Sequence, residues 1–244
     1  MKKLNLFILS IFLLSSVYAQ EIRKDLKSFS RVIASPRVNV ILTKGDRESI
    51  RLVYNNVSEE KINIEVRHRT LMIYLDNARK VEKMSPYYES RHSRRSMYHD
   101  AELTAYVTYK DLESLEIRGN QELTCNDPID TEAFRLKAYG ENEITFASLR
   151  TDFFKASLYG QNILKVKKGK VVEQKYKLYG ENRIDTREMK SAFASASIFG
   201  EGDVKITTTE EVRLNAFGEP SIHVNGGAHV NKRLIFGRTA VHQY

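Results

Sequence analysis

The sequence predicts an all-β protein whose main part is a parallel β-solenoid with coils of about 20 residues. Three observations support this fold class. A glycine-centred motif recurs at nearly constant spacing, apolar residues alternate on both sides of each glycine, and no stretch shows the helical period of about 3.6 residues. A fixed short period means that one structural unit is stacked many times, so it outweighs any single local motif.

The repeat glycines lie 18 to 20 residues apart and are expected to form the turn of each coil. Between two strands, a glycine most simply supplies a positive φ that a Cβ atom would oppose. A weaker first copy of the motif surrounds Gly119. The predicted turn residues are Gly140, Gly160, Gly180, Gly200 and Gly218, with a last, fading copy at Gly237.

Apolar residues flank each glycine with a period of two. Around Gly140, for example, Leu136, Ala138, Ile144 and Phe146 are apolar and the residues between them are mostly polar. This alternation predicts one half-buried strand before the glycine and a second strand after it. A single coil cannot bury its inner face alone, so neighbouring coils must supply the partner surface.

Asparagine follows the glycine by two positions in three consecutive copies, at Asn142, Asn162 and Asn182. The alternation directs these side chains inward at the corner of the coil. There they are expected to bond to backbone groups of adjacent coils, which satisfies polar groups exposed by the bend. An architectural role is therefore preferred to a binding role.

An aromatic residue precedes each glycine and is expected to point outward, on the same face as Lys137 and Lys177. Because neighbouring coils lie about 4.8 Å apart, the rings should stack into a ladder. The ladder either stabilises the fold under another part of the chain, or forms an exposed stripe that binds a glycan or a protein. The row consists of Tyr139, Tyr159, Tyr179, Phe199, Phe217 and Phe236.

A row of mostly acidic residues follows the glycines: Glu141, Gln161, Glu181, Glu201 and Glu219. Stacked carboxylates repel one another, and such a row could hold cations. A solvated acidic edge is the preferred interpretation, since no calcium-solenoid motif is present.

The start of the chain predicts export. Residues 1–20 combine two lysines, an apolar run and a Val17-x-Ala19 cleavage pattern, which is typical of a secretory signal peptide. The chain has a net charge of +8, which favours anionic partners, but export excludes nucleic acid from serious consideration. No other segment is apolar enough to span a bilayer, so we expect no integral membrane protein. The expected location is the periplasm or cell envelope of a bacterium, with the surface or the extracellular space as alternatives.

We expect two parts after the signal peptide: a β-rich region at 21–110 and the solenoid repeats at 111–244. Alternating strands at 29–75 form either the first coils or a β-cap that protects the open end of the solenoid. Residues 76–100 interrupt the pattern with a basic, tyrosine-containing insertion. This insertion is interpreted as a solvated loop, or as a contact site for an anionic polymer or membrane surface.

Several of these segments resemble one family. The segments are Phe29-Ser-Arg-Val-Ile-Ala, Val38-Asn-Val-Ile-Leu, Lys44-Gly-Asp and the Leu-Glu-Ser-Leu-Glu-Ile-Arg-Gly run that ends at Gly119. Followed by glycine-centred repeats, they resemble the putative auto-transporter adhesin head domain (head GIN domain) family over about residues 29–240. The resemblance implies a right-handed β-helix and an adhesive or surface-binding role, and it supplies no catalytic residues. The sequence differs from the family pattern before the glycine, where Tyr and Phe replace small polar residues.

An enzyme is not expected. Asp152, Asp185 and Asp203 stand at different offsets from the repeat glycines, so they do not converge on one ladder position. No nucleophile motif, cofactor motif or Cys/His metal-ligand spacing is present, and the single cysteine, Cys125, has no activating base nearby.

We therefore expect an exported envelope module that binds a glycan or an envelope or surface protein along the repeat face. The candidate binding residues are Tyr139, Tyr159, Tyr179, Phe199, Phe217, Lys137 and Lys177. The alternatives are a structural envelope protein that self-associates into a homo-oligomer and, less favoured, a polysaccharide-active β-helix enzyme.

Overall fold

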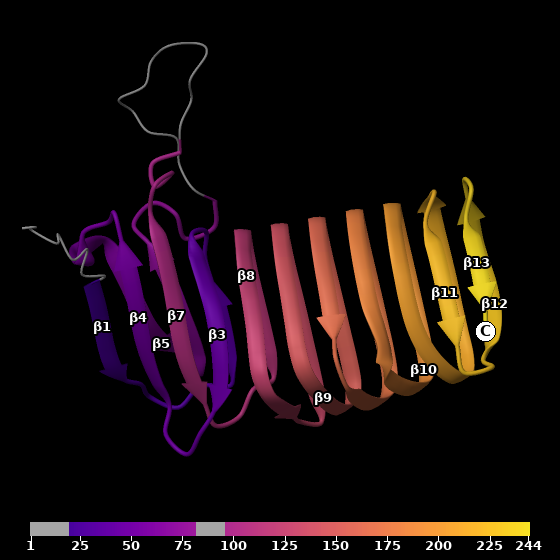
Figure 1. Cartoon of the computed structure of the whole chain (residues 1–244), viewed down its shortest axis with the longest axis horizontal. Helices are drawn as coiled ribbons and strands as arrows, with labels where there is room; N and C mark the ends of the chain where they lie inside the picture. The colour runs from indigo at the N-terminus through magenta and orange to yellow at the C-terminus, as the bar shows by residue number, and fades with distance from the viewer. Residues whose placement is uncertain (1–19, 82–95) are drawn as a thin grey trace, which may run out of the picture.

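The computed structural model describes residues 20–81 and 96–244, which form one elongated stack of strands (Figure 1). Residues 1–19 of the predicted signal peptide and most of the predicted basic insertion lie outside the described residues. The described chain is nearly all β, as predicted, and contains a single 3-10 turn, η1 (Glu59–Lys61). Its strands run from β1 (Gln20–Asp25) at one end of the stack to β13 (Ala240–Gln243) at the other.

Three very long strands, β8, β9 and β10, form the solenoid and continue through its bends. Their bounds are Ser114–Asp130, Ala133–Val166 and Gly169–Gly218. The pairing is parallel and keeps the repeat in register, so that Gly119 lies beside Gly140 and Gly160 beside Gly180. The predicted parallel β-solenoid, with about six turns of roughly 20 residues, is confirmed.

Each coil contributes one strand segment before its glycine and one after it. The segments before the glycines form what we call the ladder face, which includes residues 135–139, 155–159 and 175–179. The segments after the glycines form the second face, which the strands β11 (Ser221–Asn225) and β13 continue. The last segment of the ladder face is β12 (His229–Phe236), which pairs with β10.

The region at 29–75 supplies both a first coil and a cap. Strands β2 (Arg31–Ala34) and β3 (Val38–Lys44) pair in parallel with β8, so they form the first coil. Beyond them, β7 (Glu102–Tyr109) and β6 (Thr70–Leu75) add one more parallel strand to each face.

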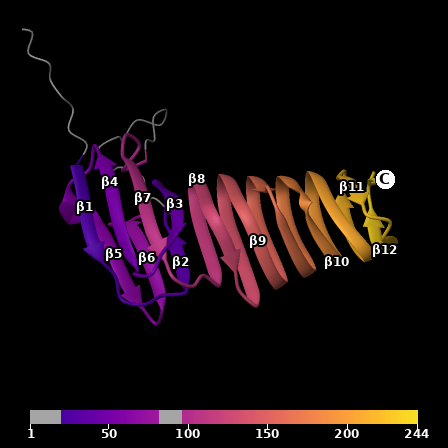
Figure 2. The same ribbon diagram turned by 60° about the horizontal axis from the view of Figure 1, so that its bottom comes forward.

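Antiparallel strands then close this end. On one face, β4 (Ser49–Asn55) pairs with β7 and β1 pairs with β4; on the other, β5 (Ile62–Arg67) pairs with β6. Figure 2 shows these two rows of strands. The outermost strand, β1, is short and mostly charged and exposed, which suits an edge that must not template aggregation.

The core lies between the two faces. From Gly140 to Gly218, the residues two and four positions before the glycine and four positions after it are buried, as the alternation predicts. Phe134, Phe146 and Phe154 pack together, with ring centroids 5.5 and 6.0 Å apart. The burial of these apolar side chains provides most of the folding free energy of such a stack.

The core also contains one polar network that the repeat pattern does not predict. Tyr176 donates to the Gln174 side-chain oxygen at 2.7 Å, and Gln174 donates to the Ser191 hydroxyl at 2.7 Å. The Thr186 and Thr208 hydroxyls complete the network through Tyr176 and Ser191, at 2.9 Å each. All five side chains are buried and hydrogen-bonded, which avoids the cost of unpaired polar groups in the core.

Candidate functional site

The ladder face is positioned by the bends of the coils. Each repeat glycine has a positive φ, between 95° and 137° for Gly140 to Gly218. A Cβ atom built on Gly160 would lie 2.3 Å from the backbone oxygen of Gly140, so a larger residue would push neighbouring coils apart. The glycines thus hold the preceding residue of every coil at the same place on the outer surface.

The asparagine side chains stabilise the bends from the interior of the solenoid. Asn142 donates to Asn162 at 2.8 Å, and Asn162 donates to Asn182 at 3.0 Å. Asn142 and Asn182 also donate to backbone oxygens in their own coils, those of Tyr139 and Tyr179. The bonds between coils therefore run from amide to amide, whereas the sequence suggested bonds to the backbone of adjacent coils.

The aromatic residues form one continuous ladder over six coils. Its ring centroids are 4.9 Å apart at every step from Tyr139 to Phe217, and 5.1 Å apart at the last step to Phe236. Neighbouring ring planes lie within 14° of parallel. The spacing equals the distance between paired strands, because the rings follow the stacking of the coils.

No described part of the chain covers the ladder. Its tyrosines are half-buried by their neighbours, Phe199 keeps 37% of its surface exposed, and Phe236 keeps 59%. Stacking covers the ring faces, so the ladder presents ring edges and the Tyr139, Tyr159 and Tyr179 hydroxyls to the outside. A sugar ring that stacks on an aromatic face would find free faces only at the two ends of the ladder.

Five basic side chains lie beside the tyrosines on the same face. We call them the basic cluster: Arg135, Lys137, Lys155, Lys175 and Lys177. The register places Lys175 beside Lys155 and Lys177 beside Ser157. Within the described residues, no carboxylate forms an ion pair with any of the five.

The positive charges of this cluster repel one another. Partial burial, together with the charges of Lys177, Lys175, Arg135 and Lys137, lowers the pKa of Lys155. Lowering of an amine pKa means that the charged form is held in unfavourable surroundings, which a bound anion would improve.

The sequence indicated Lys137 and Lys177 but missed Arg135, Lys155 and Lys175. These three residues lie five positions before a repeat glycine, and Lys137 and Lys177 lie three positions before one. The same alternation that predicted Lys137 on the outer face places all five there. Extending the alignment of the repeats by one outward position would have identified them.

The ladder face changes character halfway along the solenoid. In the next coil Ser195, Ser197 and Phe199 replace Lys175, Lys177 and Tyr179, and the exposed Phe193 lies nearby in sequence. In the coil after that, Asn215 replaces the lysine and Arg213 pairs with Glu211 at 2.9 Å. We call the two parts the Tyr–Lys half and the Phe–Ser half.

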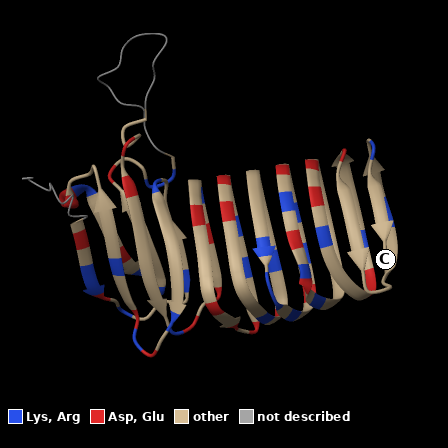
Figure 3. Cartoon of the chain, in the orientation of Figure 1, with Lys and Arg blue, Asp and Glu red and all other residues tan. Residues whose placement is uncertain are grey.

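The second face is electrostatically balanced. Acidic and basic residues both lie on its strands, which face the viewer in Figure 3, and they alternate at 183–187 and 203–205. The ion pairs Asp203–Lys205, at 2.7 Å, and Asp185–Arg187, at 2.8 Å, join residues two positions apart. The hydrogen bond from Arg187 is the main cause that lowers the pKa of Asp185.

The acidic row after the glycines lines a shallow cleft of about 420 Å³ at the edge of the second face. Among the described residues, no three His, Cys, Asp or Glu side chains are grouped closely enough to hold a metal ion. The solvated acidic edge therefore stays a prediction.

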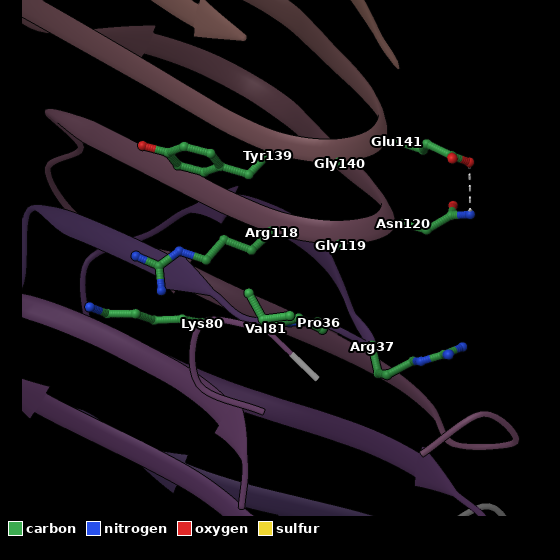
Figure 4. Close-up of a pocket in the computed structure, with 10 residues that line it drawn as sticks. All are labelled: Pro36, Arg37, Lys80, Val81, Arg118, Gly119, Asn120, Tyr139, Gly140 and Glu141. Atoms are coloured by element: carbon green, nitrogen blue, oxygen red, sulfur yellow. Dashed lines mark hydrogen bonds between the residues drawn. The ribbon is translucent and has the colours of Figure 1, made fainter. Parts of the chain in front are cut away.

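A second cleft, of about 720 Å³, opens where the ladder begins (Figure 4). Arg118 takes the place of the aromatic residue in the coil of Gly119, so among the described residues no aromatic ring stacks on this side of Tyr139. Tyr139, Arg118 and Lys80 extend side by side in the same direction. Arg118 is held by an ion pair with Glu116 and donates to the Arg79 backbone oxygen at 3.0 Å.

Fold and surface together define a class of protein: a capped parallel β-solenoid with a regular aromatic and basic outer face. A family model described as "putative auto-transporter adhesin, head GIN domain" matches residues 28–228. The chain belongs to this family, as its sequence motifs suggested. None of the curated proteins matches the chain.

Solved structures show the same fold over more than nine tenths of the chain. A crystal structure of a "putative adhesin" from Bacteroides fragilis has a TM-score of 0.70, with 16% identity over 94% of this chain and 98% of that one. A "putative adhesin" from Parabacteroides merdae has a TM-score of 0.67, with 15% identity over 92% and 95%. A "putative lipid binding protein" from Parabacteroides distasonis has a TM-score of 0.61, with 12% identity over 92% and 96%.

Proposed function

We propose that this protein is an exported cell-envelope module of the adhesion type, and that its binding surface is the ladder face. The six-ring ladder, partly exposed along its length, is the observation that carries the proposal. A continuous aromatic stripe in contact with water is typical of an interaction surface, since a monomer gains little from leaving it uncovered. The solenoid supplies rigidity and length, as in other repeat proteins that bind along one face.

The partner proposed is a molecule of a cell surface or envelope, a glycan or a protein. Family membership and the adhesins among the fold relatives support this class of partner. The description of one relative as lipid-binding adds a lipid surface as a third ligand class to test. Among the described residues, no helix is long and apolar enough to cross a bilayer. We place the protein in the periplasm or envelope after removal of residues 1–20.

The proposal assigns no catalysis. Asp185 and Asp203, two of the candidate carboxylates, are engaged in ion pairs with neighbouring Arg and Lys residues. Asp152 lines a different cleft, at the corner that also holds Asp130 and Arg150. A glycoside hydrolase needs two carboxyl groups facing each other across a substrate, and these three are not grouped in that way.

The double variant Tyr159→Ser and Tyr179→Ser tests the binding surface. Purified protein is applied to an array of acidic and neutral glycans and to envelope extracts, and folding is followed by circular dichroism. We expect binding to be lost while the β-sheet spectrum remains. Full binding by the folded variant would remove the ladder as the binding surface, and loss of folding would assign the ladder a structural role.

The open end of the solenoid supports the alternative, self-association. In the described chain, β12 and β13 each pair with one strand only, and Leu234 and Phe236 are more than half exposed. Unpaired strand edges readily pair with another chain. Sedimentation velocity over a range of concentrations separates the two functions, because a monomer at every concentration would remove the alternative.

A further inference from the structure

We propose that the ligand of the ladder face is a linear acidic polysaccharide, bound by the Tyr–Lys half with its chain along the long axis of the solenoid. The inference rests on the proposed function and names the ligand class for that surface. Three features of the described residues carry it: the unpaired basic cluster, the spacing of its rows, and the position at which tyrosine gives way to phenylalanine.

The basic cluster indicates an anionic ligand. Its five cations share one face over three coils, and the pairing of the second face is missing here. Lys155 lies in the middle, half-buried among the other four. Like charges held this closely destabilise the free protein, so the arrangement is favourable mainly when an anion binds.

The geometry indicates a polymer with regularly spaced charges. Arg135, Lys155 and Lys175 occupy the same position in three consecutive coils, and the rings beside them repeat every 4.9 Å. A sugar residue in an extended chain has a length close to one such step. A polysaccharide lying along the axis therefore advances at about the pace of the coils, and the carboxylates or sulfates on its near side face the same row of cations.

Along the ladder face, the tyrosine hydroxyls and the basic side chains stop at the same coil. Tyr139, Tyr159 and Tyr179 accompany the basic cluster, whereas Phe199 follows in the coil in which serines replace the lysines. The tyrosine ring contributes the same stacking as phenylalanine and adds one hydrogen-bonding group. This coincidence indicates that the outer edge of the Tyr–Lys half contacts a polar ligand.

Two other anionic ligands fit less well. A small molecule needs a concave site, and Tyr139 is the one residue of the Tyr–Lys half that lines any of the three clefts described above. A bilayer surface needs apolar side chains that insert beside the cations. The exposed phenylalanines, Phe193, Phe199 and Phe236, lie in the other half of the face.

The test compares two triple variants that remove the same charge. The first variant removes three of the five charges of the basic cluster by Lys155→Ser, Lys175→Ser and Lys177→Ser. Serine already stands at two of these positions one coil later. The control variant carries Lys167→Ser, Lys168→Ser and Lys170→Ser, since these exposed lysines lie at another corner of the coil. A third variant, Tyr159→Phe with Tyr179→Phe, removes the hydroxyls and keeps the ladder.

Binding is measured by calorimetry, at low and high salt, to polygalacturonate, to neutral dextran, and to vesicles of phosphatidylglycerol and phosphatidylcholine. We expect salt-sensitive binding to polygalacturonate, roughly tenfold weaker in the Lys155, Lys175 and Lys177 variant, because each exposed charge pair contributes modestly. The tyrosine variant should bind several-fold more weakly. The control variant should bind as the native protein does.

The remaining outcomes overturn the inference. Binding to vesicles alone would assign the surface to a membrane, and ladder-dependent binding to dextran would keep the proposed function but not the acidic ligand. If both lysine variants bound polygalacturonate equally weakly, the binding would depend on the net charge of the protein and not on the basic cluster. Binding to none of the three probes would contradict the acidic polysaccharide as the ligand. The proposed function would then still be decided by the array of glycans and envelope extracts, with the double variant Tyr159→Ser and Tyr179→Ser.

Discussion

Gly160 illustrates how a single residue sets the spacing of the coils. Its φ is +107°, and a Cβ atom at this position would lie 2.3 Å from the backbone oxygen of Gly140. The neighbouring atom belongs to the backbone of Gly140, whose coil is itself held by parallel pairing with the coil of Gly119. Neither the conformation nor the contact can relax locally, which explains why glycine recurs at this position.

We predict that Gly160→Ala destabilises the protein by roughly 3 kcal/mol or more, because backbone strain and a backbone clash add. Gly227→Ala is the matched control, since Gly227 has a φ of +77° but no atom within 4 Å of the built Cβ. The control should lose only about 1–2 kcal/mol from the conformation itself. Urea unfolding measures both, and equal losses would show that the contact between coils does not matter.

Two buried tyrosines predict sensitivity to alkali. Burial is the main cause that raises the pKa of Tyr109 and of Tyr176 far above the ordinary value of 10.0. Above pH 10.0 the unfolded chain loses these protons and the folded chain keeps them, so the free energy of unfolding falls as the pH rises. Below that pH both states are protonated and the two groups have no effect.

Tyr109→Phe checks this prediction, because the Tyr109 hydroxyl makes only long contacts, at 3.4 Å to Cys125 and 3.5 Å to the Pro128 oxygen. The slope of stability against pH above 10.0 should become shallower by about 1.4 kcal/mol per pH unit, the share of one proton. Urea midpoints measured across this range give the slope. An unchanged slope would assign the alkaline loss to other groups.

At the scale of the element, the asparagine row joins three coils through a chain of buried amides. Asn162 is its centre, since it accepts from Asn142 and donates to Asn182. Asn162→Ala leaves buried amide groups on both sides with fewer partners, and we predict a loss of roughly 1–3 kcal/mol. Gln161→Ala, one residue earlier and exposed, should change stability by less than about 0.5 kcal/mol. Similar losses in urea unfolding would contradict a role for the row.

The elements differ in how far the sequence predicts them. The period of the glycines and the alternation around them are enough for the coils, the parallel stacking and the outward direction of Tyr159, because these follow from strand geometry alone. The same alternation does not separate β2 and β3, which form a coil, from β4 and β5, which pair antiparallel. Both kinds of strand have a period of two, and only the partner distinguishes them.

Contacts between coils are equally hard to predict. Tyr176 stands in an apolar row of the repeat, yet its hydroxyl is bonded to Gln174 and Thr186, and the network extends to residues of the following coil. The exposure of the ladder likewise depends on whether another segment folds over it. The sequence left both alternatives open, and the described chain leaves the rings half exposed.

At the scale of the whole molecule, charged residues of different kinds occupy different positions along and around the long axis of the solenoid. The basic cluster lies on the ladder face in the coils of Gly140, Gly160 and Gly180, paired charges lie on the second face, and the acidic row runs along the edge between them. The repeat makes this sorting possible, because one position in the coil becomes a whole row. Few substitutions per coil are then needed to change a surface from basic to neutral, as Ser195 and Ser197 do.

A stack of this kind also has graded stability. Each coil contacts only its neighbours, so a coil in the middle is held from two sides and a terminal coil from one. In the described chain β9 pairs with both β8 and β10, whereas β13 pairs only with β11 and is mostly exposed. The N-terminal end differs, because antiparallel strands close it.

We therefore predict that amide exchange proceeds inward from the C-terminal end. Peptides from β12 and β13 should exchange hydrogen for deuterium fastest among the strands, and peptides from β9 slowest, because local opening needs fewer contacts to break at an uncapped end. Mass spectrometry of the exchanged protein measures the order. Protection of β13 equal to that of β9 would mean that this end is covered in solution, and its loss on dilution would identify the cover as a second copy of the chain.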